Sequence, residues 1–337
     1  MRNPPSPSPL CSRPVGNYGL DDWADVDDGG WPTLLVGNGA SIAVSSDFGY
    51  DSLFQVAPLT VDDTDLFDAL ETKNFEEVLN HLRTASLVCE QLGHASQDVD
   101  DRYESIRDAL IEAVHDHHVE WLDVDDEDRL DTIRDALLDF DTVFSTNYDL
   151  LIYWAMMNSG DPPGAGFGDL FWNHQNAFDS LNTERFGDKT LVYWLHGGLH
   201  LYWGPAGETR KRTNTGANLL QSFASGGRIP LFVSEGSWKQ KRRAIHRSDY
   251  LEHAYRTFAS TDGPLVVFGQ GLGGADTHLI RAIREDPTRN IAYAIYPSSQ
   301  QAVDLRQAEV SNLFPQASIE FFDSTTHPLG DPSLAVP

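Results

Sequence analysis

VFSTNYDLLIYW, residues 143–154, begins as a short apolar strand that stops at Ser145. Asn147 and Asp149 lie in the polar turn that follows, and the chain then becomes apolar again. Burying such side chains is costly unless they have hydrogen-bonding partners. A ligand at the end of the strand would supply those partners. On residue types alone, an Asx turn that caps a helix is the commoner explanation.

Apolar runs elsewhere in the chain indicate the sheet to which this strand belongs. Seven short runs are predicted as buried strands: residues 33–37, 142–146, 191–197, 230–236, 264–271, 290–297 and 318–323. Most are apolar on both faces, as in a parallel sheet that is covered on both sides. Helical patterns lie between several of them, at residues 74–92, 102–122 and 127–140. This alternation predicts an α/β, doubly wound, mostly parallel and Rossmann-like sheet, with ligands at the carboxyl ends of the strands.

The pattern also predicts how the chain is organised. Residues 1–30 are rich in Pro, Ser, Gly and Asp, and we expect them to be disordered. Residues 31–330 are expected to form one domain. A helical insertion without a convincing strand occupies about residues 62–140, after the first strand. The insertion could be a lid, an oligomer contact or a partner surface.

Composition narrows the classes of protein to consider. Asp and Glu number 51 against 24 Lys and Arg, which gives a net charge of −27 at pH 7. Such a surface suits a salty cytoplasm and repels nucleic-acid phosphates, so we expect a halophilic, cytoplasmic protein without a nucleic-acid partner. The 2 cysteines cannot build a four-cysteine zinc site. No run approaches the roughly 20 apolar residues that span a bilayer, and the N-terminus lacks a signal-peptide core.

Two glycine-rich loops follow predicted strands. GNGAS places Gly37, Asn38, Gly39 and Ser41 after the first strand, where free N–H groups of a starting helix would favour a phosphate. A plain turn capped by Ser41 explains the same residues equally well.

The second loop, FGQGLGGAD, contains Gly269, Gly271 and Gly274 in the spacing GxGxxG. A dehydrogenase fingerprint would also need an acid after the next strand, which ends AIYPSS without one. We therefore expect this loop to touch a ribose or phosphate, with Asp276 capping the next helix.

Histidines and a basic segment supply further candidates. His196 in LHGG follows a strand and precedes flexible backbone, which suits a general base, although a core histidine is the alternative. His200 is expected on a following strand or hairpin. HDHH, residues 115–118, is expected to be a solvated face rather than a metal site. The cations of residues 239–247 could meet phosphates or an acidic partner, and a solvated helix face is at least as good an explanation.

The order of these motifs is more specific than any one of them. GNGAS, STNYD, LHG and FGQGL, from about Leu34 to about Asp323, together resemble the sirtuin-like NAD-binding superfamily. PLFVSEGSWKQKRRAIHRSDYLEHA further resembles a prokaryotic, haloarchaeal-type branch of that superfamily. The resemblance implies a sirtuin-type sheet with NAD as substrate or ligand.

Carried over to this chain, the resemblance assigns roles to the polar residues. Asn147 would orient the nicotinamide ribose and a water, Asp149 would bind the carboxamide, and His196 would be the general base. The residues implied to contact the cofactor are Gly37, Asn38, Gly39, Ser41, Thr146, Gly269, Gly271 and Asp276.

Departures from the family pattern bear on the reaction. Sirtuin deacetylases carry glutamine where Thr146 stands, and they bind zinc through four cysteines that this chain lacks. SDFGYDSLF retains Asp47 and Phe48 of a family loop without its arginine. The resemblance therefore favours a metal-independent NAD glycohydrolase like those of antiviral defence. A non-catalytic NAD or ADP-ribose sensor and a protein ADP-ribosyltransferase stay open as alternatives, as do NAD against NADP and a homo-oligomer or an activating partner.

Overall fold

A seven-stranded sheet forms the centre of the computed structural model, which describes residues 18–27, 30–49, 53–124, 128–158, 164–182, 187–204, 206–213, 230–233 and 237–336. Its strands are β1 (Thr33–Val36), β2 (Thr142–Ser145), β3 (Phe167–Gly168), β4 (Thr190–Trp194), β8 (Leu265–Phe268), β9 (Asn290–Ile295) and β10 (Ser318–Asp323). Their order is β10-β9-β8-β1-β2-β4-β3, and every described pairing is parallel. The predicted α/β, doubly wound sheet is therefore confirmed.

The strand order locates a crevice at the sheet's carboxyl edge. From β1 the chain passes to β2, then to the edge strand β3 and back to β4, which lies between β2 and β3. It then returns to β8 on the other side of β1 before reaching β9 and β10. The connections from β1 and β8 thus leave in opposite directions. Doubly wound sheets bind their ligands at such a switch point.

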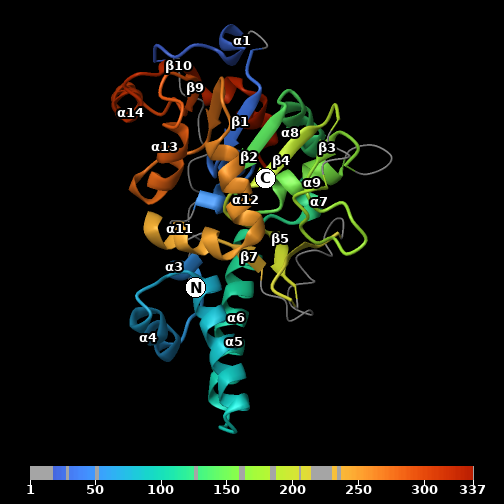
Figure 1. Ribbon diagram of the computed structural model, residues 1–337. Coiled ribbons are helices and arrows are strands. Elements are labelled where there is room, and N and C mark those ends of the chain that lie inside the picture. Colours follow the sequence, from blue (N-terminus) through green and yellow to red (C-terminus); the bar gives the residue numbers. More distant parts are fainter. Residues whose placement is uncertain are drawn as a thin grey trace.

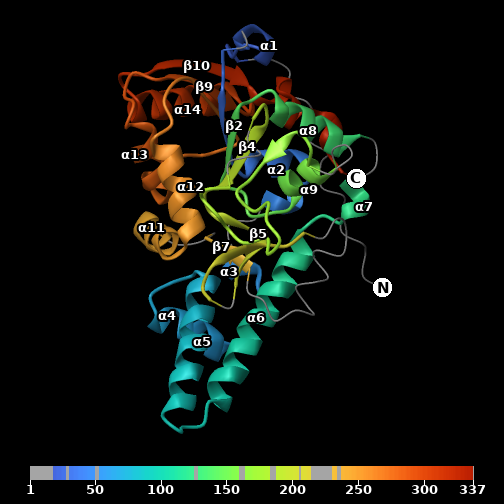
Figure 2. The same ribbon diagram turned by 45° about the vertical axis from the view of Figure 1, so that its right-hand side comes forward.

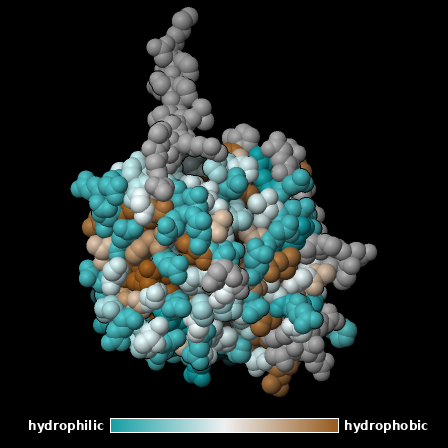
Figure 3. Space-filling view, turned by 90° about the horizontal axis from the view of Figure 1, so that it is seen from above, coloured by the Kyte–Doolittle hydropathy of each residue, from teal (hydrophilic) through white to brown (hydrophobic). Residues whose placement is uncertain are grey.

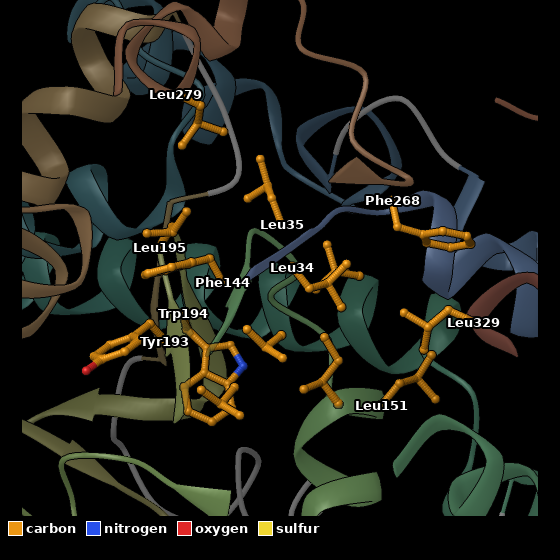
Figure 4. Close-up of a cluster of buried hydrophobic side chains, with 14 of the residues drawn as sticks. Leu34, Leu35, Phe144, Leu151, Tyr193, Trp194, Leu195, Phe268, Leu279 and Leu329 are labelled. Carbon is orange, nitrogen blue, oxygen red and sulfur yellow. The ribbon is translucent and has the colours of Figure 1, made fainter. Parts of the chain in front are cut away.

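Helices cover both faces of this sheet (Figure 1). Alternate residues of a strand point to opposite faces. Figure 4 shows Leu35 pointing toward Leu279 of α13 (Thr277–Ile283), and Leu34 pointing toward Leu151 of α9 (Leu151–Met157). On the α13 side, Phe144 also packs against Phe258 of α12 (Asp249–Ala259) with ring centroids 4.9 Å apart. The apolar runs are thus buried on both sides, as their composition predicted.

The remaining described helices lie mostly before β2 or flank the return to β8. They are α1 (Trp23–Val26), α2 (Gly39–Val44), α3 (Leu53–Val56), α4 (Val61–Ala69), α5 (Phe75–Gln91), α6 (Gln97–His117), α7 (Trp121–Val124), α8 (Arg129–Leu138), α11 (Trp238–Arg247) and α14 (Gln300–Leu313), with the 3₁₀ turns η1 (Ser46–Gly49), η2 (Gly274–Asp276), η3 (Ser324–Thr326), η4 (Pro328–Gly330) and η5 (Pro332–Leu334). The elements described between α4 and α8 are all helical, as predicted for about residues 62–140. Of these, α5 and α6 form a hairpin that projects away from the sheet (Figures 1 and 2).

One face of the surface is seen in a view coloured by hydropathy. On the face shown in Figure 3, hydrophilic side chains are spread widely and apolar ones lie among them. None of the helices that the structure describes is both long and apolar enough to span a bilayer.

One predicted strand belongs to a different sheet. The run 230–236 forms β7 (Pro230–Phe232), and residues 234–236 lie outside the described part of the chain. It pairs antiparallel with β5 (Gly197–Trp203), which also pairs with β6 (Thr209–Lys211). An apolar run on both faces therefore did not require the parallel sheet here, because β7 is buried in a small antiparallel sheet instead. His200 lies on β5, as expected.

The N-terminal segment is ordered where the structure describes it, so the expectation of disorder up to residue 30 is wrong there. Residues 1–17 and 28–29 lie outside the described residues. Asp21 forms a parallel bridge with Phe322 of β10, and its carbonyl accepts the N–H of Asp323 at 2.9 Å. Trp23 and Val26 are buried against the domain. The few apolar side chains among the acids anchor this segment, which composition averaged over 30 residues obscures.

Burial of histidine gives a testable dependence of stability on pH. His327 packs between Trp23 and Phe268, at ring-centroid distances of 4.7 and 4.9 Å, and its Nδ1 accepts the N–H of Leu329 at 3.0 Å. Burial lowers the pKa of His327 to about 3. In the unfolded chain this imidazole binds a proton near pH 6.5, whereas in the folded protein it stays neutral. The free energy of unfolding therefore falls as the pH decreases below that value.

We predict that His327→Asn, which retains an acceptor for the N–H of Leu329, weakens this acid sensitivity. Between pH 7 and pH 5 the parent should lose about 2 kcal/mol of unfolding free energy through this imidazole, and the variant should not. Urea unfolding at both pH values measures the difference. The exposed His81→Gln serves as the control, and an unchanged pH dependence in His327→Asn would contradict the assignment.

Candidate functional site

A buried hydrogen-bond network joins the STNYD turn to the helix after β1. The hydroxyl of Ser41 on α2 donates to Asp149 Oδ2 at 2.5 Å, and Asn147 Nδ2 donates to Ser41 Oγ at 2.8 Å. The other Asp149 oxygen accepts the N–H of Leu151, the first residue of α9, at 2.9 Å. All three polar side chains are at most 5% exposed. The structure thus brings Ser41, Asn147 and Asp149 together at the carboxyl edge.

These bonds fix the orientation of the Asn147 amide. A serine hydroxyl has one proton, and Ser41 gives it to a carboxylate that can only accept. Ser41 Oγ must therefore accept from Asn147 Nδ2. The amide oxygen, Asn147 Oδ1, is the end of the amide that does not bond to Ser41. That oxygen is buried and has no hydrogen-bond partner among the described residues. An unmet buried acceptor costs about 1–3 kcal/mol, so Oδ1 is where the hydroxyl of a water or ligand would bind.

His118 supports the same turn, contrary to the expectation of a solvated face for HDHH. Its Nε2 accepts the N–H of Leu150 at 2.9 Å and its Nδ1 donates to the carbonyl of Val119 at 2.8 Å. Its ring contacts Phe48 and Trp154 edge-on. Burial is the main cause that lowers the pKa of His118. The chain turns inward after α6, and the periodicity of the sequence could not show this turn. Among the described residues, no group of three or more His, Cys, Asp or Glu could hold a metal ion.

The two glycine-rich loops lie against each other at the switch point. The N–H of Gly39 donates to the carbonyl of Gly269 at 2.9 Å, and the N–H of Gly37 donates to the carbonyl of Phe268 at 2.9 Å. A Cβ at Gly39 would lie 2.6 Å from the Cα of Gly269, which itself has a φ of +66°. A Cβ at Gly271 would meet no atom of the described residues within 4 Å. Gly39 and Gly269 therefore serve a contact between loops, whereas Gly271 is open.

The helix after β1 begins earlier than a Ser41 cap requires. Asn38 is the N-cap residue of α2, a helix of 6 residues, and Ser41 lies within it. The Asn38 side chain makes no capping bond to the helix, and its Nδ2 donates instead to the carbonyl of Phe48 at 2.9 Å. The capping alternative for Ser41 is therefore wrong, and its hydroxyl is committed to Asp149 instead.

A second network crosses from the end of β2 to the loop after β8. Thr146 Oγ1 donates to Gln270 Oε1 at 2.6 Å, and Gln270 Nε2 donates to Asp276 Oδ2 at 2.9 Å. The other Asp276 oxygen pairs with Lys241 Nζ at 3.2 Å. Asp276 precedes α13 as expected, but its side chain does not cap that helix. Gln270 was missed by the sequence analysis, although a long polar side chain between two glycines was a visible signal.

His196 belongs to the region of this second network. Its Nε2 lies 2.9 Å from His278 Nε2, so one ring donates to the other. Burial, together with the positive charge of Lys241, holds the pKa of His196 well below its usual range. Burial likewise lowers the pKa of His278 to about 4. Both rings are therefore neutral near pH 7.

Asn147 and His196 reach one edge of the sheet through neighbouring strands. Ser145 and Trp194 are register partners in β2 and β4, and each polar residue follows its strand by two positions. Their hydrogen-bond partners nevertheless differ, since Asn147 joins Ser41 and His196 joins His278. The site consists of two adjacent networks, linked through the consecutive residues Thr146 and Asn147.

The basic helix α11 turns part of its charge inward. Lys241 is buried beside Asp276, and Arg242 pairs with Glu252 at 2.8 Å. Arg247 on the outer side lies 3.3 Å from Glu77 of α5. These pairs favour the explanation that the cluster offsets acids of this chain. On the inner side of α11 and α12, Ile245, Leu251 and Phe258 are buried, whereas Tyr255 is half-buried.

The loop contact predicts a sharp difference between two glycines. Gly39→Ala would force a methyl group against the Gly269 backbone, and such overpacking typically costs about 1–3 kcal/mol of unfolding free energy. Gly271→Ala should change it by less than about 0.5 kcal/mol, because the added methyl has space. Urea unfolding of both variants measures this. Equal effects of the two substitutions would contradict the described contact.

Comparison with known proteins identifies the family. A family model described as a domain of unknown function, DUF4917, matches residues 34–329. The match runs from β1 to η4, so it includes the whole carboxyl edge described above. A search among curated proteins finds no match. Because the matched region is well over half of the sequence, this chain belongs to the DUF4917 family.

Proposed function

We propose that this protein is an NAD glycohydrolase, which cleaves NAD into nicotinamide and ADP-ribose. The observation that carries the proposal is Asn147 Oδ1, a buried acceptor beside the switch point to which none of the described residues donates. The resemblance to sirtuin-like NAD-binding proteins supports the same location. Its motifs GNGAS, STNYD, LHG and FGQGL fall at the carboxyl ends of β1, β2, β4 and β8. A role in antiviral defence, implied by that resemblance, is part of the same proposal.

The reaction asks mainly for orientation. Water oxygen bonds to C1′ of the ribose while the bond from C1′ to the nicotinamide nitrogen breaks and leaves its electron pair on nicotinamide. The departing pyridinium becomes neutral, so the leaving group is already good. Positive charge builds on the sugar, and the protein's contribution is to place water and ribose. Asn147 Oδ1 would accept a hydrogen bond from the water or from a ribose hydroxyl.

His196 would take the proton that water loses. Because its pKa is well below the usual range, this ring is neutral near pH 7 and has a lone pair that can accept a proton, but it is a weaker base than an ordinary histidine. The hydrogen bond to His278 holds the ring at the end of β4. General-base help of this kind typically contributes about 10²–10⁴-fold to the rate.

A non-catalytic sensor of NAD or ADP-ribose is the second candidate. The observation that favours it is the pairing of His196 with His278 rather than with the network of Asn147. In a sensor, the orphan oxygen of Asn147 would still bind a ribose hydroxyl, and no base would be needed.

Incubation of the purified chain with NAD, from low to multimolar KCl, tests the two candidates. We predict release of nicotinamide, reduced by about 10²–10⁴-fold in His196→Ala. Loss of the orienting amide in Asn147→Ala should reduce it by about 10²-fold. The exposed His81→Ala is the matched control and should retain the parent rate.

The outcomes separate the alternatives. Binding of NAD without any nicotinamide release would overturn the glycohydrolase and favour the sensor. Transfer of label from NAD to protein would identify an ADP-ribosyltransferase instead.

The low pKa of His196 predicts an unusual pH profile. An ordinary histidine of pKa about 6.5 would lose about three-quarters of its neutral form at pH 6. Because burial and the charge of Lys241 lower the pKa of His196 and keep its ring neutral, the rate of NAD cleavage should stay nearly constant from pH 8 to pH 6. Initial rates across this range provide the measurement, and an acid limb centred near pH 6.5 would argue against His196 as the base.

A further inference from the structure

The side chain of Gln270 lies across the ends of three strands. It starts in the loop after β8, and its Oε1 would collide with a Cβ at Gly37, just beyond β1. The same oxygen accepts from Thr146, just beyond β2. This path crosses the switch point, where a doubly wound sheet binds its ligand. Gln270 therefore occupies space that a bound nucleotide would use.

The main chain around Gln270 is held in place, whereas its side chain is only partly buried. The hydroxyl of Tyr293 donates to the Gln270 carbonyl at 2.6 Å. The preceding residue, Gly269, accepts the N–H of Gly39 at 2.9 Å. Rotation of the side chain, with two hydrogen bonds broken, is therefore the way to vacate this position.

We propose that Thr146 and Asp276 form a subsite for a primary carboxamide, and that Gln270 occupies it until a ligand's carboxamide takes its place. The inference rests on the proposed function in naming nicotinamide as that ligand group. A primary carboxamide has one acceptor oxygen and an N–H₂ donor. The Thr146 hydroxyl and the Asp276 carboxylate provide the matching donor and acceptor at 2.6 and 2.9 Å from the Gln270 amide.

This subsite differs from the one that the sequence resemblance implied. Asp149 was expected to bind the carboxamide, but one of its oxygens accepts from Ser41 and the other from Leu151. It is also buried, with 4% of its surface exposed. Asp276 and Thr146 are more accessible, and both already hold an amide. The geometry thus moves carboxamide recognition to the second network.

Charge makes the subsite selective. Lys241 pairs with one Asp276 oxygen, and the other oxygen is left to accept an N–H. A ligand carboxylate has no proton to donate and would bring a second negative charge to Asp276. Nicotinamide should therefore bind, and nicotinic acid should not.

Emptying the subsite provides the test. While the Gln270 side chain occupies the subsite, a ligand cannot bind there. The apparent Kd therefore equals the intrinsic Kd divided by the fraction of molecules whose subsite is vacant, and removal of the side chain strengthens binding. Gln270→Ala, with Gln270→Ser as a second emptied variant, should lower the Kd for nicotinamide at least about tenfold in calorimetric titration. Adding Thr146→Val should cancel the gain, and nicotinic acid should show none. Thermal unfolding verifies that each variant is folded.

The results distinguish this inference from the proposed function. An unchanged Kd for nicotinamide in both emptied variants would overturn the subsite, even if the parent cleaves NAD. Tighter nicotinamide binding in a protein that never releases nicotinamide from NAD would support the subsite and overturn the glycohydrolase. A gain for nicotinic acid equal to that for nicotinamide would also overturn it, because the selectivity of Asp276 would be absent.

Discussion

The close approach of two backbone loops, beyond β1 and β8, is the constraint on which the site depends. Gly39 and Gly269 meet through main-chain atoms, with no room for a Cβ at Gly39. This contact places α2 so that Ser41 reaches Asp149, and it fixes the start of the loop that carries Gln270. Both polar networks therefore depend on the same pair of glycines. The parallel sheet determines where the site lies, and the contact between the loops determines the distances between the polar side chains of the two networks.

Much of the fold could be predicted from the sequence, because buried parallel strands leave a local signal. Runs such as 264–271 and 290–297 are apolar on both faces, and their alternation with helices implies the layers. The apolar pattern gave the wrong expectation where residues are buried for a reason other than membership of the central sheet. Residues 230–232 are as apolar as a central strand but lie in the small antiparallel sheet. The N-terminal segment is polar on average, yet Trp23 and a bridge to Phe322 hold it in place.

The candidate site was predicted in part. Asn147, Asp149 and His196 stood out because polar residues end apolar runs, and the structure places all three at the carboxyl edge. Their partners could not be predicted, since hydrogen bonds such as that of Ser41 with Asp149 join residues 108 positions apart. For the same reason His118 was assigned to a solvated face, and His278 and Gln270 were given no role. Residue type indicates which atoms need a hydrogen-bond partner, and only the three-dimensional arrangement shows which atoms serve as that partner.

The N-terminal segment has a consequence for how this protein behaves at high concentration. An open sheet ends in strands whose unpaired N–H and C=O groups can recruit strands from other molecules. At one border, β3 has only 2 residues, too short to template such pairing. At the other, Asp21 takes up main-chain groups of β10, and Trp23 covers Phe322. The segment thus protects this edge of the sheet from pairing with strands of other molecules. Proteolytic removal of the residues before Asp27 would expose β10 as a template for fibrous assembly.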